Sequence, residues 1–160
     1  DGAMIKGPAI IGRNCDIRHN AYIRENVIIG DHCTVGNASE IKNSILFNES
    51  VAPHFNYVGD SILGFKAHLG AGAKISNYKL VPGSIAVNVN GRRIDTGLRK
   101  FGALLGDRAE VGCNAALNPG RVVGRDSVIY PNTNWRGVLA PGKVAKNQAA
   151  QQVVDRRGQS

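Results

Sequence analysis

Residues 5–41 read IKGPAI IGRNCD IRHNAY IRENVI IGDHCT VGNASE I, so that one aliphatic residue opens every group of six. This period matches neither the turn of an α-helix, about 3.6 residues, nor the two-residue alternation of a β-strand. Self-similarity at a period of six is typical of a parallel β-helix, whose coils stack on one another. We therefore predict an all-β, single-stranded parallel β-helix of about six coils. The bulky apolar residues in phase with the repeat are Ile5, Ile11, Ile17, Ile23, Ile29, Val35, Ile41, Leu46, Ala52, Val58, Leu63, Leu69, Ile75, Leu105, Val111, Leu117, Val123, Ile129 and Trp135.

Two further positions of the repeat carry small residues. Glycine often follows the aliphatic residue, as at Gly12 and Gly36, and we expect it at corners whose backbone angles other residues resist. A small residue stands four places after the aliphatic one, as at Cys15 and Cys33, and we expect it to point into the narrow tube. Cys113 falls in a different slot and is expected to face outward.

The composition fits one thin-cored, basic domain. Glycine makes up 20 of the 160 residues and aromatic residues only 6%, which suits a solenoid rich in corners. The net charge of +8 fits a solvated basic surface, and it also favours small phosphorylated ligands over nucleic acid, because the cations are scattered and aromatics are few.

Several features bear on location. The chain has no apolar run long enough to cross a membrane and no visible signal peptide. Two inward thiols within an odd cysteine count favour a reducing compartment, so we predict a cytoplasmic protein. Because the repeat starts in phase without a cap, we expect further residues upstream.

The repeat lapses between Ile75 and Leu105, where Asn90 and Gly91 separate two alternating segments. An Asn-Gly pair in this setting predicts a two-stranded hairpin. We predict an extruded loop near residues 80–104 within a β-helix domain of residues 1–144. A tail over 145–160 follows, either with a short helix at 148–156 or as a frayed end. The loop is either a plain insertion or a flap over a phosphate site, since it carries four cations. These are Arg92, Arg93, Arg99 and Lys100.

One stretch combines a cation, an imidazole and a phenol, at Lys42, His54 and Tyr57. Lys42 and His54 are twelve residues apart, which is two sides of a three-sided coil, so within one chain they need not face each other. A site at the junction of two subunits would let them converge.

These segments resemble the C-terminal acetyltransferase domain of the bifunctional UDP-N-acetylglucosamine pyrophosphorylase/glucosamine-1-phosphate acetyltransferase, and the β-helix domains of related sugar-1-phosphate nucleotidyltransferases. The likeness runs without gaps over residues 24–78 and resumes over 100–133. Members of this hexapeptide-repeat family are left-handed β-helices that form homotrimers and transfer acetyl from acetyl-CoA to glucosamine-1-phosphate. The resemblance therefore implies left-handed coils, a homotrimer, acetyl-CoA as co-substrate and no metal.

The resemblance also implies the site residues. The arginine and lysine that bind the sugar phosphate match Arg24 and Lys42, and the catalytic histidine matches His54. The tyrosine that contacts the sugar matches Tyr57, and the lysine that reaches in from a neighbouring subunit matches Lys100. The acetyl-CoA contacts of the family match Ala71, Asn77 and Tyr78.

Three positions depart from the family pattern. His68 stands where the family has a sugar-binding asparagine, whereas Cys113 and Pro131 stand where it has a serine and an alanine at the CoA site. The loop between Lys79 and Arg99 is also longer. We retain His68 as a substrate contact and Cys113 and Pro131 as CoA contacts, and expect the changes to affect the acyl donor more than the sugar phosphate.

Amide formation requires a deprotonated amine, and imidazole accepts protons near neutral pH. His54 would act as general base while Arg24 and Lys42 anchor the phosphate and so orient the amine. Backbone N–H groups on adjacent coils would polarise the thioester. The predicted activity is an acyl-CoA-dependent N-acetyltransferase acting on an amino-sugar phosphate such as glucosamine-1-phosphate.

Other hypotheses stay open at this point. The domain could be a non-catalytic trimerisation or regulatory module of a sugar-1-phosphate nucleotidyltransferase. It could be a zinc enzyme like the γ-class carbonic anhydrases, although their His-x4-His spacing is absent from the sequence. Cys113 could be a nucleophile, although no paired base stands near it. Arg24 and Lys42 could be ordinary surface charges, and the tyrosines could pack at a subunit seam.

Overall fold

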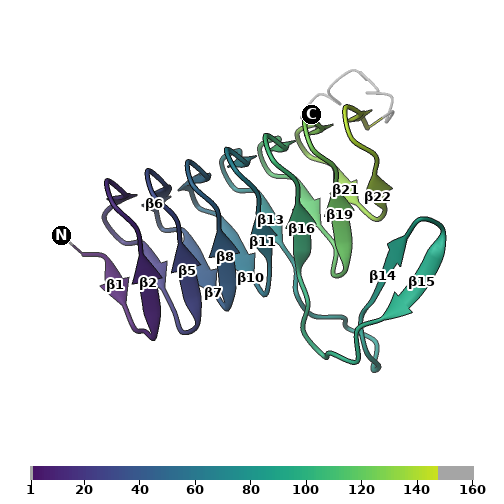
Figure 1. Ribbon diagram of the computed structural model, residues 1–160, viewed down its shortest axis with the longest axis horizontal. Coiled ribbons are helices and arrows are strands. Elements are labelled where there is room, and N and C mark those ends of the chain that lie inside the picture. The colour runs from purple at the N-terminus through teal and green to yellow at the C-terminus, as the bar shows by residue number, and fades with distance from the viewer. Residues whose placement is uncertain (1, 148–160) are drawn as a thin grey trace, which may run out of the picture.

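The computed structural model describes residues 2–147, which form a left-handed parallel β-helix with three flat sides (Figure 1). Each side is a seven-stranded parallel sheet, and successive strands join sheets A, B and C in turn. The predicted all-β class and β-helix architecture are confirmed. We name the three edges of the prism after the sheets they join, as the A–B, B–C and C–A edges.

Every coil contributes one short strand to each sheet. Sheet A contains β1 (Met4–Ile5), β4 (Tyr22–Ile23), β7 (Glu40–Lys42), β10 (Tyr57–Gly59), β13 (Lys74–Ile75), β18 (Ala116–Leu117) and β21 (Asn134–Trp135). Sheet B contains β2 (Ala9–Ile11), β5 (Val27–Ile29), β8 (Ser44–Leu46), β11 (Ile62–Leu63), β16 (Ala103–Leu105), β19 (Arg121–Val123) and β22 (Val138–Leu139). Sheet C contains β3 (Asp16–Ile17), β6 (Thr34–Asn37), β9 (Val51–His54), β12 (His68–Leu69), β17 (Glu110–Val111), β20 (Val128–Ile129) and β23 (Val144–Ala145).

The predicted number of about six coils is wrong by one, since each sheet has seven strands. Leu139 and Ala145 pair with the preceding coil and complete the seventh. Leu139 follows Trp135 after four residues instead of six. A strict period of six therefore ends at Trp135 and misses most of the last coil.

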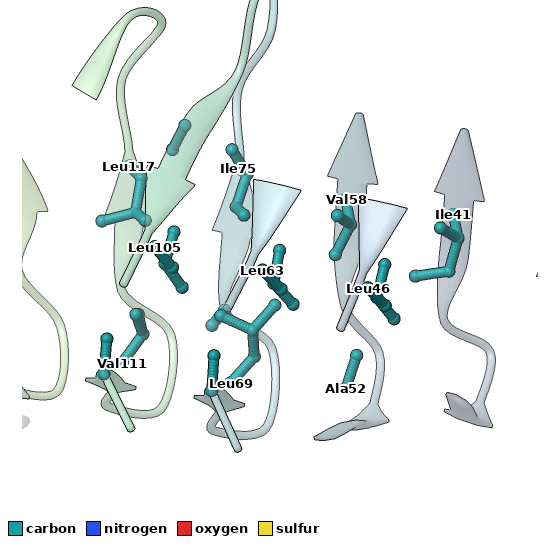
Figure 2. Close-up of a cluster of buried hydrophobic side chains, with 14 of the residues drawn as sticks. Ile41, Leu46, Ala52, Val58, Leu63, Leu69, Ile75, Leu105, Val111 and Leu117 are labelled. Carbon is teal, nitrogen blue, oxygen red and sulfur yellow. The ribbon is translucent and has the colours of Figure 1, made fainter. Parts of the chain in front are cut away.

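The interior of the prism is a set of aliphatic columns, one for each sheet (Figure 2). In the column of sheet A, Ile41, Val58 and Ile75 pair in register and are fully buried. Each buried aliphatic side chain stabilises the fold by roughly 1.5–3 kcal/mol. Cys33 lies inside the tube and Cys113 is exposed, as predicted.

The glycines of the repeat are required by close approach of the coils and not by corner backbone angles, so the reason expected from the sequence is wrong. A Cβ atom built on Gly36 would lie 1.5 Å from the backbone oxygen of Pro53 on the next coil. The left-handed backbone angles belong to other residues, among them Asn14, Asn20 and Asn26. Asparagine adopts this conformation more readily than most residues because its short polar side chain bonds locally.

The break in the repeat forms the predicted hairpin. Strands β14 (Ala86–Val89) and β15 (Arg92–Asp95) pair antiparallel around Asn90 and Gly91, which both have positive φ. The hairpin leaves the A–B edge, between β13 and β16, and lies beside the last coils (Figure 1). The predicted tail helix at 148–156 lies outside the described residues. Within residues 2–147 no helix has the length and apolarity to cross a membrane.

Candidate functional site

A tightened corner at the A–B edge carries a nearly buried carboxylate. The step from Val58 to Leu63 takes five residues instead of six, and Asp60 turns the chain there with a φ of 51°. Asn43 occupies the equivalent corner one coil earlier, and its Nδ2 atom donates to Oδ1 of Asp60 at 2.7 Å. The side chain of Asp60 is 9% exposed. A charged group is therefore held in a nearly buried position at this corner.

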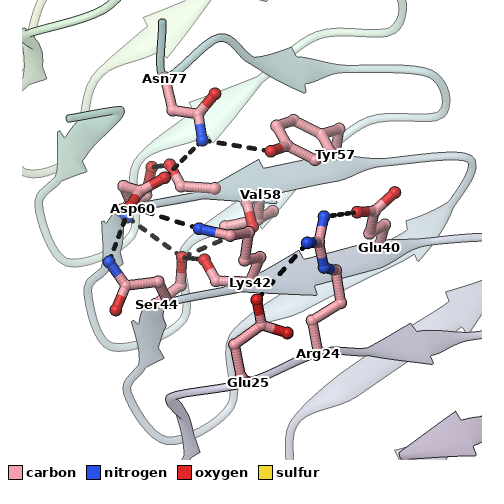
Figure 3. A network of polar contacts seen from close by, with 12 residues as sticks. Arg24, Glu25, Glu40, Lys42, Ser44, Tyr57, Val58, Asp60 and Asn77 are labelled. Carbon is pink, nitrogen blue, oxygen red and sulfur yellow. Dashed lines mark hydrogen bonds and ion pairs between the residues drawn. The ribbon is translucent and has the colours of Figure 1, made fainter. Parts of the chain in front are cut away.

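Asp60 is the centre of a network that positions Lys42 and Asn77 (Figure 3). The Nζ atom of Lys42 lies 3.8 Å from Oδ1 of Asp60, and Nδ2 of Asn77 donates to Oδ2 of the same carboxylate. The Lys42 side chain is 15% exposed. Salt screens such a partly buried pair less than a surface pair.

Tyr57 lies on the outer side of β10 and points toward the same edge. A Cβ atom built on Gly59 would lie 2.7 Å from the hydroxyl oxygen of Tyr57, so glycine leaves room for the ring to lie over the strand. Nδ2 of Asn77 donates to this hydroxyl at 3.2 Å. Burial raises the pKa of Tyr57, and the hydrogen bond from Asn77 offsets part of this effect. The phenol therefore stays protonated near neutral pH and can donate to a ligand.

Arg24 lies at the same edge, one coil before Lys42, and is held by two carboxylates. Its Nη1 donates to Oε1 of Glu40 at 2.9 Å, and its Nη2 donates to Oε1 of Glu25 at 3.5 Å. The hydrogen bond to Glu40 raises the pKa of Arg24. A hydrogen bond from its own backbone lowers the pKa of Glu25, and the charges of Lys6, Arg24 and Lys42 lower it further. Among residues 2–147, the buried Nε atom of Arg24 has no acceptor.

This arrangement suits an anion. The ammonium of Lys42, whose ion pair is long, and the hydroxyl of Tyr57 leave donors available at one edge, close to the charge of Arg24. Cationic donors bind phosphate with short, strong hydrogen bonds. Within the described part of the chain, no group of three or more His, Cys, Asp or Glu residues is placed to hold a metal ion.

His54 lies outside this network. It ends β9 and is exposed at the C–A edge, whereas Lys42 ends β7 at the A–B edge. From Asn56 to Asp60 the chain crosses sheet A in four steps of about 3.3 Å, so roughly 13 Å separates the two edges. One chain therefore does not place His54 beside Lys42, which agrees with the expectation from their spacing.

The C–A edge collects a second group of predicted residues in one column. The backbone carbonyl of His54 accepts a hydrogen bond from Gly72 at 2.9 Å, and the same bond recurs from Asn114 to Ala71 and from Asn132 to Cys113. Equivalent positions on four consecutive coils are thus filled by His54, Ala71, Cys113 and Pro131.

The remaining predicted residues lie elsewhere. His68 is exposed on the outer side of β12 in sheet C. Tyr78 and Lys100 pair across the base of the loop, where Arg99 stacks on the Tyr78 ring at 5.1 Å and donates to its hydroxyl at 2.8 Å. Lys100 borders a hollow over sheet B.

Sequence reasoning missed the carboxylates Glu25, Glu40 and Asp60, which hold the cations of the site. The signal available for Asp60 was the shortened step of the repeat from Val58 to Leu63. Nothing in the spacing marked Glu40, whose partner Arg24 is sixteen residues away and becomes its neighbour only in the coiled chain.

The fold and the repeat define a left-handed β-helix domain of the hexapeptide type, with a polar network at one edge. The chain belongs to the GMPPB C-terminal domain family, whose model matches residues 5–129. This confirms the predicted kinship with β-helix domains of sugar-1-phosphate nucleotidyltransferases.

Two relatives carry related names. The bifunctional sugar-1-phosphate nucleotidylyltransferase/acetyltransferase of Sulfurisphaera tokodaii is 37% identical over 149 residues, covering 82% of this chain and 37% of the relative. The bifunctional protein GlmU of Methanococcus vannielii is 38% identical over 112 residues, covering 70% of this chain and 27% of the relative. The chain thus spans well under half the length of these relatives.

Among solved structures, the UDP-N-acetylglucosamine acyltransferase from Campylobacter jejuni has a similar fold. It superimposes with a TM-score of 0.60 at 15% identity, covering 91% of this chain and 69% of that one. At this identity the similarity bears on the β-helix architecture alone.

Proposed function

We propose that this domain is an acyl-CoA-dependent N-acetyltransferase that acts on an amino-sugar phosphate such as glucosamine-1-phosphate. The observation that carries the proposal is the division of the candidate residues between two edges. One edge holds the anion-binding network around Lys42, and the other holds the column that begins at His54. An acyl transfer has two substrates. The network around Lys42 suits the short, anionic sugar phosphate, and the column that begins at His54 suits the long acyl donor.

The A–B edge would bind the sugar phosphate. Lys42 and Arg24 are already held by Asp60 and Glu40, so little side-chain ordering remains when the ligand arrives. The hydroxyl of Tyr57 supplies a further donor, and the guanidinium of Arg24 adds positive charge. A phosphate fixed there would orient the amine of the sugar.

The C–A edge would bind the acyl donor, with its thioester at the His54 end. His54 accepts a proton from the amine as the nitrogen attacks the thioester carbonyl, the C–S bond breaks, and the CoA thiolate leaves and takes up a proton. Ala71, Cys113 and Pro131 continue the column with small side chains, which leaves space for an extended pantetheine arm.

A homotrimer would join the two edges. The outer row of sheet B is aliphatic on every coil, and an exposed apolar row of this length marks an interface. A hollow of about 520 Å³ lies over this row and is bordered by Leu98, Lys100 and Phe101. The residues of the row are Ile10, Ile28, Ile45, Ile62, Leu104, Val122 and Val138.

The proposed packing sets sheet B of one copy against sheet C of the next, and three such contacts close a ring. The A–B edge of one copy then meets the C–A edge of its neighbour, so that Lys42 faces His54 of the next copy. The same interface would contain Lys100, which lies beside sheet B, and His68, which lies on sheet C. Both could then contact the substrate, as predicted from the resemblance.

The test is a thiol-release assay with acetyl-CoA and glucosamine-1-phosphate. We expect His54→Ala to lower turnover by about 10²–10⁴-fold, the usual contribution of a general base. His19 is the matched control, because it occupies the equivalent position of the C–A edge two coils earlier, and His19→Ala is expected to keep wild-type turnover. Absence of CoA release from the wild type, or equal turnover of His54→Ala and wild type, would reject the proposal and favour the non-catalytic module.

A further inference from the structure

A second hollow, of about 700 Å³, lies between the hairpin and the last coils at the A–B edge. Its floor is formed by the corners of the β-helix that follow β18 and β21, and its wall by the start of the loop and by the hairpin. The hairpin is fixed over it, since Ile85 is buried and a Cβ atom on Gly120 would lie 2.5 Å from the backbone oxygen of Ala86.

Four cations line this hollow from two directions. Arg121 and Arg136 come from the coil corners, and Lys79 and Arg93 come from the loop and the hairpin. No carboxylate lines it, and none of the four forms an ion pair within residues 2–147.

The other polar groups near the hollow leave these cations without an ion pair. The neighbouring carboxylate, Asp95, accepts hydrogen bonds from Ser84 and from the backbone of Gly97, and these bonds lower its pKa. The nearby charges of Arg93 and Lys79 lower that pKa further, so Asp95 offsets part of the positive charge on this side of the hollow. The Nε atom of Arg121 is buried and has no acceptor in the described part of the chain. Lys79 donates one hydrogen bond, to the carbonyl of Ser84 at 2.8 Å, and an ammonium group has two more protons to donate.

We propose that this hollow binds the diphosphate group of a nucleotide-type ligand. Four converging cations exceed what one phosphate neutralises, whereas a diphosphate spreads its charge over several oxygens that guanidinium groups bind in pairs. The volume is that of a small-molecule site and not of a single ion. Tyr78, Val81 and Ile85 give the hollow an apolar side where a base or another organic group would lie.

The inference stands apart from the proposed acyl transfer. The network around Lys42 lies on earlier coils of the same edge. Of the predicted sugar and CoA contacts, Tyr78 alone borders the hollow, and Arg93 is one of the loop cations expected near a phosphate. Binding of a diphosphate is measured without an acyl donor, so each proposal can fail while the other survives.

The experiment is calorimetric titration of the whole chain with inorganic pyrophosphate at low ionic strength. We expect saturable binding that weakens as salt is added. Arg121→Gln and Arg136→Gln should each weaken it by about tenfold or more, because each removes a charged hydrogen-bond donor. Arg125→Gln is the matched control: it removes the same charge from the coil of Arg121 but at the B–C edge, where the side chain is 70% exposed, and it should bind like the wild type.

Two outcomes would overturn the proposal: no saturable binding of pyrophosphate to the wild type, or equal weakening by Arg121→Gln and Arg125→Gln with all variants folded by circular dichroism. Competition then identifies the source of the diphosphate. Displacement of pyrophosphate by CoA assigns the hollow to the acyl donor, and displacement by a nucleoside diphosphate but not by CoA assigns it to a separate nucleotide. Orthophosphate should compete at least tenfold less well than pyrophosphate, and equal competition would reject the diphosphate.

Discussion

The Nζ atom of Lys42 lies 3.8 Å from Oδ1 of Asp60, which turns the next coil at the same edge. Because the two residues are eighteen positions apart, only the stacking of coils brings them together. The carboxylate also holds the amides of Asn43 and Asn77, so it fixes the cation and the coil corners at once.

Replacing Asp60 by alanine should therefore destabilise the fold. The buried amide of Asn77 and the largely buried ammonium of Lys42 would lose their acceptor, and we expect the free energy of unfolding to fall by about 2 kcal/mol, the cost of unsatisfied buried groups. Urea unfolding measures the change. Asp16→Ala is the control: its carboxylate is 57% exposed, its ion pair with Arg18 is a surface pair, and it should change stability by less than about 1 kcal/mol. Equal losses in the two variants would contradict the role given to Asp60.

If the aliphatic outer row of sheet B forms the trimer interface, a charge introduced there should break up the trimer. Ile45→Glu should convert the proposed trimer to single chains of about one third of its mass. The cause is that a carboxylate in an apolar contact must be desolvated without a partner. Sedimentation equilibrium measures this. Ala116→Glu places the same charge on the exposed outer side of sheet A and should leave the mass unchanged. A wild-type chain that sediments as a monomer would refute the shared site.

Mixed trimers test whether two copies share one site. Lys42→Met removes the proposed phosphate anchor and His54→Ala the proposed base, and each variant alone should be inactive. After unfolding and joint refolding at equal amounts, about a quarter of the sites should combine an intact Lys42 with an intact His54 from the neighbour. Thiol release should recover to about that fraction of wild-type turnover. If both residues act within one chain, the mixture stays inactive.

Close packing of the coils predicts that Gly36 tolerates no side chain. Gly36→Ala should lower the free energy of unfolding by about 3 kcal/mol or more, because the new Cβ meets the backbone of Pro53, which cannot move without shifting a coil. Thermal or urea unfolding gives the value. Gly97→Ala separates this effect from backbone strain: its φ is +68° with open space around it, and it should cost about 1 kcal/mol. A tolerated Gly36→Ala would show that the coils can separate.

The pair of Arg108 and Asp126 predicts a loss of stability in acid. Hydrogen bonds from Arg108 lower the pKa of Asp126 below its ordinary value. A depressed folded-state pKa stabilises the protein above the unfolded value of about 3.9, and this contribution disappears as the pH falls through the folded-state value. Asp126→Asn should therefore lose less stability than the wild type between about pH 6 and about pH 3 in urea unfolding. Parallel losses would show that the pair contributes nothing.

Much of the architecture was predictable because the repeat is local. An aliphatic residue every sixth position sets the inward columns, and the pair Asn90 and Gly91 sets the hairpin turn. The predicted number of coils was one too low because Leu139 breaks the period, although the predicted domain of residues 1–144 includes most of the seventh coil. The requirement for Gly36 was misread because it depends on Pro53 in another coil, which no local pattern reveals.

For the candidate site, too, some features follow from local sequence and others only from the folded chain. The sequence by itself determined the coils, the hairpin and the identity of the cations, because these follow from the period, from turn chemistry and from residue type. The separation of His54 from Lys42 also followed from their spacing. Only the tertiary structure decided that Asp60 holds Lys42, that Glu40 holds Arg24, and that Arg121 and Arg93 face one hollow. Each of these brings together residues far apart in the chain, and their positions depend on where each coil turns.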